Sequence, residues 1–191
     1  MTATVRRLLQ GIEVAALGGS CILLIGLADH FTSWPMLTST LGPTAYLLLA
    51  HPDQEASRFR NAAAGHGTAI AAGLGGLCLT GSWSVASSFL YQSATLRHVL
   101  AAAIAVAITL FVLGASDLHH APAGSTAVLV ATGLAGPGKL LAGLAMGLIA
   151  LFILVRVIDT LPGRHRPGRF GHQGAIVETA GLVVGATQEG R

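Results

Sequence analysis

Four stretches of about twenty mostly apolar residues constrain the fold of this chain more than any other feature. They span residues 8–28, 61–80, 97–116 and 139–158. A helix of about 20 apolar residues is long enough to cross the hydrocarbon core of a bilayer. Only 10% of the 191 residues are charged and the mean hydropathy is +0.68, whereas about a quarter of the residues in a soluble domain are charged. We therefore expect an all-α protein in the lipid bilayer.

Two further apolar segments, at about 41–50 and 122–135, are shorter than a membrane crossing. Each follows a polar approach, DHFTSWPMLTSTLGP in the first case and DLHHAPAGS in the second. The proline and glycine in these approaches argue against a continuous helix. We interpret both segments as broken or half helices. The order long, short, long therefore occurs twice along the chain.

A short phrase, G-x-T-A-x-L, occurs in both short segments and predicts an internal repeat. The first copy holds Gly42, Thr44, Ala45 and Leu47, and the second holds Gly124, Thr126, Ala127 and Leu129. We place the two halves at about 7–80 and 97–158. Four to six crossings follow, depending on whether the short segments turn back or complete a crossing. Three crossings per half would make the repeats inverted, as in many transporters.

The arginines predict the orientation of the chain. Arginines flank the first and the last long segments, at Arg6, Arg7, Arg156, Arg164, Arg166 and Arg169. Positive residues favour the cytoplasmic side, so both termini of this multi-pass protein are expected in the cytoplasm, with the protein in the cell (inner) membrane. We divide the chain into a transmembrane domain at 1–162 and a basic, mobile cytoplasmic tail at 163–191.

The starts of the two short helices are candidate sites for a small anion. The N-terminus of a helix carries partial positive charge and unpaired N–H donors, so two such ends facing one another can bind an anion without lysine or arginine. Proline is compatible with the first helical turn, and glycine lets a ligand approach the backbone. An alternative interpretation is a pair of tight kinks that ease helix packing. The candidate substrate-binding residues are Gly42, Pro43, Thr44, Pro122, Gly124, Ser125 and Thr126.

Two histidines and the polar start of the third apolar stretch are candidates for gating or proton-linked roles. His120 precedes Pro122 and can donate to an anion or carry a proton, which adds it to the substrate-binding candidates. His66 should face the bundle interior, where its alternative role is one hydrogen bond to a neighbouring carbonyl. Arg60 and Asn61 open the same stretch. Arg60 can reach an entering anion or extend to the membrane interface.

Other classes of function lack a signal in the sequence. No basic run is interleaved with aromatic residues, so nucleic-acid binding is not expected. No nucleophile elbow, zinc motif, phosphate loop or dinucleotide fingerprint occurs. We therefore expect no enzyme activity, no catalytic residue, no cofactor and no metal. A homodimer or higher homo-oligomer is compatible with so small a bundle, although no motif indicates one.

The polar residues around the two short segments resemble the HPP family of integral membrane proteins, over roughly residues 8 to 158. That family is named for a His-Pro-Pro motif, which here reads His120-Ala121-Pro122, followed by the small residues of AGSTAVL. The phrase LGPTAYLLLAHPD resembles the family's Leu-Gly-Ala stretch. Arg60-Asn61 with Gly65-His66 is similar to its Arg-Asn followed by Gly-Gly-His. The departures are Ala121 for the first proline and Ala64 for the first glycine.

The resemblance implies a substrate class that the residues alone do not give. Family members are described with four membrane spans, and some are assigned nitrite transport. The sequence therefore predicts a transporter or channel for a small monovalent anion, with nitrite as the named candidate. Two alternatives remain open. One is a non-transporting membrane scaffold that holds a partner through its basic tail, and the other is a channel for a small neutral solute.

Overall fold

The described residues, 2–85 and 95–161 of a computed structural model, form six α-helices and one 3-10 turn, with no strand among them. The predicted tail at 163–191 lies outside the described residues. The four long helices are each long and apolar enough to cross a membrane, and the two short helices fall where the sequence predicts them. The helices are α1 (Ala3–Thr32), α2 (Leu41–Ala50), α3 (Phe59–Leu79), α4 (Leu96–Ala115), α5 (Ala123–Ala131) and α6 (Lys139–Thr160), and the turn η1 (Glu55–Ser57) precedes α3.

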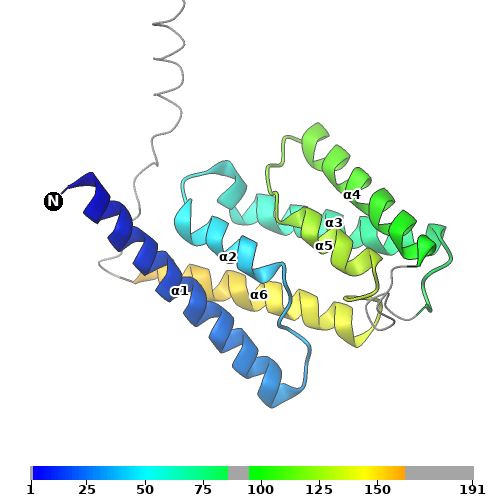
Figure 1. The fold of residues 1–191 in the computed structure, drawn as a ribbon, viewed down its shortest axis with the longest axis horizontal. Coiled ribbons are helices and arrows are strands. Elements are labelled where there is room, and N and C mark those ends of the chain that lie inside the picture. The colour runs from blue at the N-terminus through cyan, green and yellow to red at the C-terminus, as the bar shows by residue number, and fades with distance from the viewer. Residues whose placement is uncertain (1, 86–94, 162–191) are drawn as a thin grey trace, which may run out of the picture.

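The two halves of the chain are interlocked, as Figure 1 shows. Helices α1, α2 and α6 pack together on one side of the bundle, and α3, α4 and α5 pack together on the other. The last helix of each half therefore contacts the short helix of the other half, α3 with α5 and α6 with α2. The order long, short, long does occur twice, as predicted. The repeat in sequence and its inversion remain predictions.

The helices run between two ends of the bundle. One end, here called the arginine end, holds Arg7, Arg58 and Arg156. There Arg7 on α1 lines a shallow hollow with the last turn of α2, and the loop 51–58 lies against the end of α6. At the opposite end, the Lys139 ammonium at the start of α6 lies 5.7 Å from the ring centroid of Trp34, just after α1.

Each short helix continues the course of a non-helical segment from one end of the bundle to the other. Residues 33–40 leave the opposite end, and α2 then continues to the arginine end (Figure 1). Residues 116–122 leave the arginine end, where His120 contacts Ala56, and α5 then continues to the opposite end beside Gly73 of α3. The described chain thus passes between the two ends six times, four times as a long helix and twice as a loop plus a half helix.

Small residues allow the close packing that this arrangement needs. The core between α3, α4 and α5 consists almost entirely of alanine, and small side chains let helix backbones approach closely. A Cβ atom added at Gly76 of α3 would lie 2.6 Å from the carbonyl oxygen of Ala101 on α4. On α6, Gly143 and Gly147 contact the backbone of Pro35 and Met36, so these glycines hold the segment 33–40 in place. The alanines of the core are Ala69, Ala72, Ala101, Ala105, Ala123, Ala127 and Ala131.

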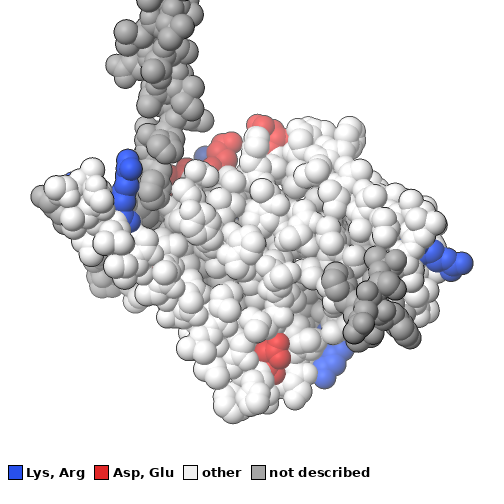
Figure 2. All heavy atoms as spheres, in the orientation of Figure 1, with Lys and Arg blue, Asp and Glu red and all other residues white. Residues whose placement is uncertain are grey.

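The outer surface fits a lipid environment. Large apolar side chains are exposed along the long helices; Leu8, Leu23 and Phe31 of α1 and Phe111 of α4 are examples. Figure 2 shows the charged side chains near the edges of one face, with uncharged surface between them. Lipid tails, unlike water, make the exposure of these side chains favourable.

Two neighbouring glycines of α3 should respond to the same substitution in opposite ways. A Cβ at Gly76 meets the Ala101 backbone, whereas one at Gly75 meets nothing within 4 Å. We expect Gly76→Ala to lower the free energy of unfolding by roughly 1–3 kcal/mol through overpacking. Gly75→Ala should leave it unchanged or raise it by up to about 1 kcal/mol, because alanine favours the helix. Thermal melts of the purified variants in detergent measure both, and equal melting temperatures would contradict this packing.

Candidate functional site

The two half helices begin against one another in the interior of the bundle. Thr40, the N-cap residue of α2, places its Oγ1 3.3 Å from the carbonyl oxygen of Pro122, the N-cap residue of α5. The same Oγ1 lies 2.9 Å from Oγ1 of Thr126 and 3.1 Å from Oγ of Ser125. Thr40 and Thr126 are fully buried. The N-terminal ends of α2 and α5, both partially positive, therefore face one another.

The backbone donors at these two helix starts are largely paired. The N–H of Thr44 donates to the carbonyl of Thr40 over 3.3 Å. In α5, the N–H groups of Ala123 and Gly124 donate to the carbonyls of His120 and Ala121, each over 3.1 Å. The expectation of free N–H donors is therefore wrong for these three residues. The positive ends of the helix dipoles remain, together with the hydroxyl groups around them.

A pair of buried histidines lies beside the helix starts. His66 of α3 and His120 of the segment 116–122 are each 2% exposed, and their Nε2 atoms are 3.1 Å apart. Their rings meet edge to face, with centroids 4.8 Å apart. Gly65 makes room for this contact, because a Cβ there would lie 3.1 Å from Cβ of His120.

The hydrogen-bond partners of the pair determine the tautomer of each ring. His120 Nδ1 must donate to the Ala56 carbonyl, 2.9 Å away, because a carbonyl only accepts. In the neutral ring, His120 Nε2 then accepts, so its donor is His66 Nε2–H. This leaves His66 Nδ1 as an acceptor for the Thr126 hydroxyl at 2.8 Å. In this neutral state both nitrogens of each imidazole have a hydrogen-bond partner.

Thr44 joins the pair to the backbone of α2. Its hydroxyl donates to the Thr40 carbonyl over 2.8 Å and lies 3.2 Å from His66 Nε2, from which it accepts. The Nε2–H of His66 is therefore shared between Thr44 and His120. The connected side chains, here called the polar cluster, are Thr40, Thr44, His66, His120, Ser125 and Thr126.

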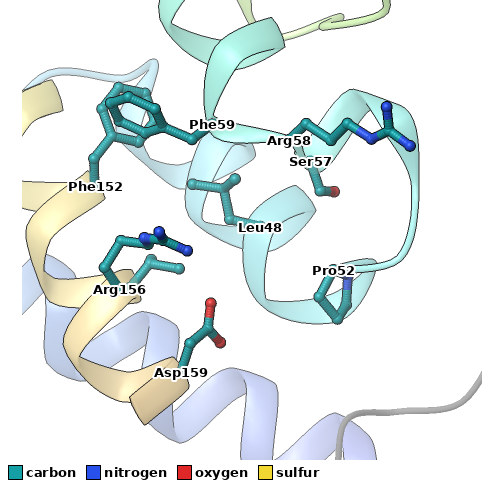
Figure 3. A pocket seen from close by; sticks show the side chains of 9 residues that line it. Leu48, Pro52, Ser57, Arg58, Phe59, Phe152, Arg156 and Asp159 are labelled. Atoms are coloured by element: carbon teal, nitrogen blue, oxygen red, sulfur yellow. The ribbon is translucent and has the colours of Figure 1, made fainter.

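A cavity of about 300 Å³ opens at the arginine end, next to the polar cluster. Figure 3 shows Arg156 and Asp159 extending from α6 into the space between α6 and the loop 51–58, while the Arg58 guanidinium points away. Phe152 lines the cavity, and its ring centroid lies 6.3 Å from that of His66. The lining residues are Leu48, Pro52, Ser57, Arg58, Phe59, Phe152, Val155, Arg156 and Asp159.

The structure brings together most of the residues that the sequence singled out. Thr44, His66, His120, Ser125 and Thr126 belong to the polar cluster, and Pro122 contributes the carbonyl that Thr40 contacts. Gly124 is half-buried beside Ser125, and a Cβ there would meet nothing within 4 Å. Gly42 and Pro43 are exposed on α2, on a different face of the helix from buried Thr44.

Arg60 and Asn61, the predicted gating residues at the start of α3, lie outside the polar cluster. Asn61 is buried, and its Nδ2 donates to the carbonyl of Glu55 over 2.9 Å, which fixes the turn η1 to α3. Arg60 is exposed. Neither side chain hydrogen-bonds to the polar cluster in the part of the chain that the structure describes.

Sequence reasoning missed two residues of the site. Thr40 links both half helices. Threonine directly before a helix is a favoured N-cap residue, which is the available signal, although the Thr40 side chain caps no N–H of α2. Phe152 lines the cavity on the side near His66, but a phenylalanine in an apolar helix carries no signal of its own. No group of three or more His, Cys, Asp or Glu residues suited to a metal occurs within 2–85 and 95–161.

Comparison with known proteins identifies the family. The model of a family described as "HPP, transmembrane region" matches residues 4–167, most of the chain. The chain therefore belongs to the HPP family of membrane proteins. No curated protein and no solved structure matches it.

Removing the Thr40 hydroxyl should separate the two helix starts. Thr40→Val removes the hydrogen bonds that join α2 to Thr126 and Ser125 of α5, and the loss of one such bond costs about 0.5–1.5 kcal/mol. The control is Thr109→Val on α4, where the buried hydroxyl donates only to Ala105 of its own helix. We expect a clear drop in melting temperature for Thr40→Val and a smaller one for Thr109→Val. The reverse order would show that Thr40 is not the link.

Proposed function

We propose that this HPP-family protein moves a small monovalent anion, with nitrite as the first candidate, across the membrane through its interior. The observation that carries the proposal is the meeting of two half-helix N-termini at a buried polar cluster inside an apolar bundle. Buried polar groups at membrane depth typically mark the path of a substrate or ion. Paired half-helix ends are a frequent form of such sites in transporters.

The electrostatics of the cluster favour a negative ligand. Each half helix directs the positive end of its dipole, about half an elementary charge, at the cluster. Hydroxyl groups of Thr40, Ser125 and Thr126 lie at these ends and can rotate to donate. Thr38, two residues before the N-cap of α2, has a buried Oγ1 without a hydrogen-bond partner within the described residues. A bound anion would satisfy such donors without a fixed positive charge.

The cavity at the arginine end supplies the entry to this path. The Arg156 guanidinium faces its interior, which the Asp159 carboxylate also lines (Figure 3), and a guanidinium at the mouth of a path attracts anions. Phe152 then separates the cavity from His66. We infer that Phe152 controls passage, because its ring must turn aside before an anion can reach the polar cluster.

The distribution of positive charge suggests an orientation for the path. Arg6, Arg7, Arg58, Arg60 and Arg156 lie at or near the arginine end, against Arg97 and Lys139 at the opposite end. Positive residues favour the cytoplasmic side. The cavity would then open to the cytoplasm. We propose that the protein lies in the cell (inner) membrane and acts as a transporter or channel rather than as an enzyme.

Bulk at Gly124 should block transport without disturbing the fold. A Cβ there enters open space at the start of α5, so Gly124→Leu should fold normally while its side chain fills the approach to Ser125. The control is Gly67→Leu, an exposed position on α3 with equally open space. In proteoliposomes we expect nitrite flux for wild type and Gly67→Leu, and little for Gly124→Leu. Wild-type flux from well-folded Gly124→Leu would rule out this path.

Removing the positive charge of Arg156 should weaken the capture of nitrite. We expect Arg156→Gln to raise KM several-fold with a smaller effect on the maximal rate, because the guanidinium acts before the anion reaches the cluster. The effect should shrink at high salt, since screening weakens such steering. Arg97→Gln, at the opposite end, is the control in liposomes loaded so that nitrite enters from the arginine end. A KM that is unchanged by Arg156→Gln at low salt would exclude the cavity as the entry.

A further inference from the structure

The hydrogen bonds of the polar cluster have a direction in the neutral state. His66 Nδ1 accepts from Thr126, so the Thr126 oxygen is free to accept from Thr40, 2.9 Å away. Thr40 in turn accepts from Ser125 over 3.1 Å. The hydroxyl protons thus all point from Ser125 toward His66.

The same atoms can also hold one more proton. If a proton from water binds the lone pair of His66 Nδ1, the new N–H donates to Thr126 across the same 2.8 Å. Thr126 then turns its hydroxyl toward Thr40, and Thr40 turns its own toward the Pro122 carbonyl at 3.3 Å. Ser125, which can no longer donate to Thr40, turns its hydroxyl to the Pro122 carbonyl at 2.8 Å. Only hydrogen atoms move, and the cluster gains one unit of positive charge.

The extra proton has two places to reside. Transfer of the His66 Nε2 proton to His120 Nε2, 3.1 Å away, leaves His66 neutral and makes His120 the imidazolium. His120 lies against the loop 51–58 at the arginine end. The pair therefore connects the hydroxyls at the helix starts to the side of the bundle that holds the cavity.

No carboxylate of the described chain hydrogen-bonds to either histidine, so the protein offers this charge no direct counter-ion. The elements around the pair carry few charged or titratable groups, and α5 carries none. The carboxylates on the adjoining segments are Asp53 and Glu55 of the loop 51–58 and Asp117 before His120, all exposed, and the half-buried Asp159 at the cavity. The other charged or titratable groups on these elements are Tyr46 on α2, His51 just after it, Arg60 and Cys78 on α3, Arg97 and His98 at the start of α4, His119 beside Asp117, Lys139 at the start of α6, and Arg58 and Arg156 at the arginine end.

The helix dipoles make the proton and an anion depend on one another. Two positive helix ends next to an imidazolium disfavour the extra proton. An anion bound at those helix ends favours the extra proton instead, and the imidazolium in turn attracts the anion. Coupling between two bound ligands is reciprocal, so each must raise the affinity of the other.

We propose that the polar cluster binds one proton together with each anion, so that the protein is a proton–anion symporter whose proton is carried by His66 and His120. The proton comes from water on one side and returns to water on the other, and no other bond changes. This inference rests on the proposed anion transport, and it adds the coupled ion and the residues that carry it.

Simultaneous measurement of nitrite and protons tests the coupling. Proteoliposomes with a clamped membrane potential and an internal pH dye should show protons entering with nitrite in wild type, beyond the flux of protein-free liposomes. Thr126→Val removes the hydroxyl that must turn from His66 toward Thr40 when the proton binds, so the ratio of protons to nitrite should fall. Thr109→Val, an isosteric change at a buried threonine outside the cluster, should keep the wild-type ratio. Wild-type nitrite flux without proton movement would leave anion transport standing and overturn the symport.

A spectroscopic measurement tests the proton site without relying on transport. Nitrogen-15 NMR of the histidine rings in lipid nanodiscs should show His66 protonated at Nε2 and His120 at Nδ1 at about pH 8. On acidification, one ring of the pair should become an imidazolium. With nitrite present, this protonation should need a proton concentration lower on the order of tenfold. Nitrite-linked protonation without nitrite flux would support joint binding and remove only the transport proposal. Titration unaffected by nitrite, or the opposite tautomers, would overturn the inference.

Discussion

The contact between the starts of the two half helices is the interaction on which the rest of the structure depends. A membrane offers no water to a buried polar group, so broken helices persist there only where the protein satisfies them. Thr40 does this for both helices at once, through the Pro122 carbonyl and the hydroxyls of Ser125 and Thr126. The buried histidines complete the arrangement, because each ring nitrogen has a partner within the cluster or the adjoining loop.

Close helix packing is what brings these groups within reach of one another. The alanines between α3, α4 and α5 and the glycines at 73 and 76 let α3 lie directly against α4 and α5. Gly143 and Gly147 do the same for α6 and the loop that leads into α2. Because the last helix of each half packs on the short helix of the other, neither half can bury its own short helix alone. Small residues therefore support the site from a distance.

A site built from dipoles, hydroxyls and neutral imidazoles suits a small ion that must both bind and leave. A fixed arginine in the bundle centre would hold an anion strongly and be costly to bury. The arginines of the described residues lie toward the two ends of the bundle, and Arg156 faces the cavity rather than the cluster. In the mechanism that we propose, positive charge reaches the centre only as a proton that arrives with the anion. Membership of the HPP family and the apolar helices provide the setting for this chemistry.

The sequence by itself determined the number, order and approximate positions of the helices, because apolar length and the proline and glycine of DHFTSWPMLTSTLGP and DLHHAPAGS act locally. It also pointed to His66, His120 and Thr126, since polar residues in such segments are rare enough to stand out. It did not predict that Asn61 fixes η1, that Gly42 and Pro43 face outward, or that Thr40 is the common partner. Only the tertiary structure decided those points and the tautomers of the histidines. These contacts depend on the rotation of each helix about its own axis, which local sequence does not specify. The contacts between the helix starts and the histidines also join residues from different segments of the chain, and local sequence does not specify such pairings either.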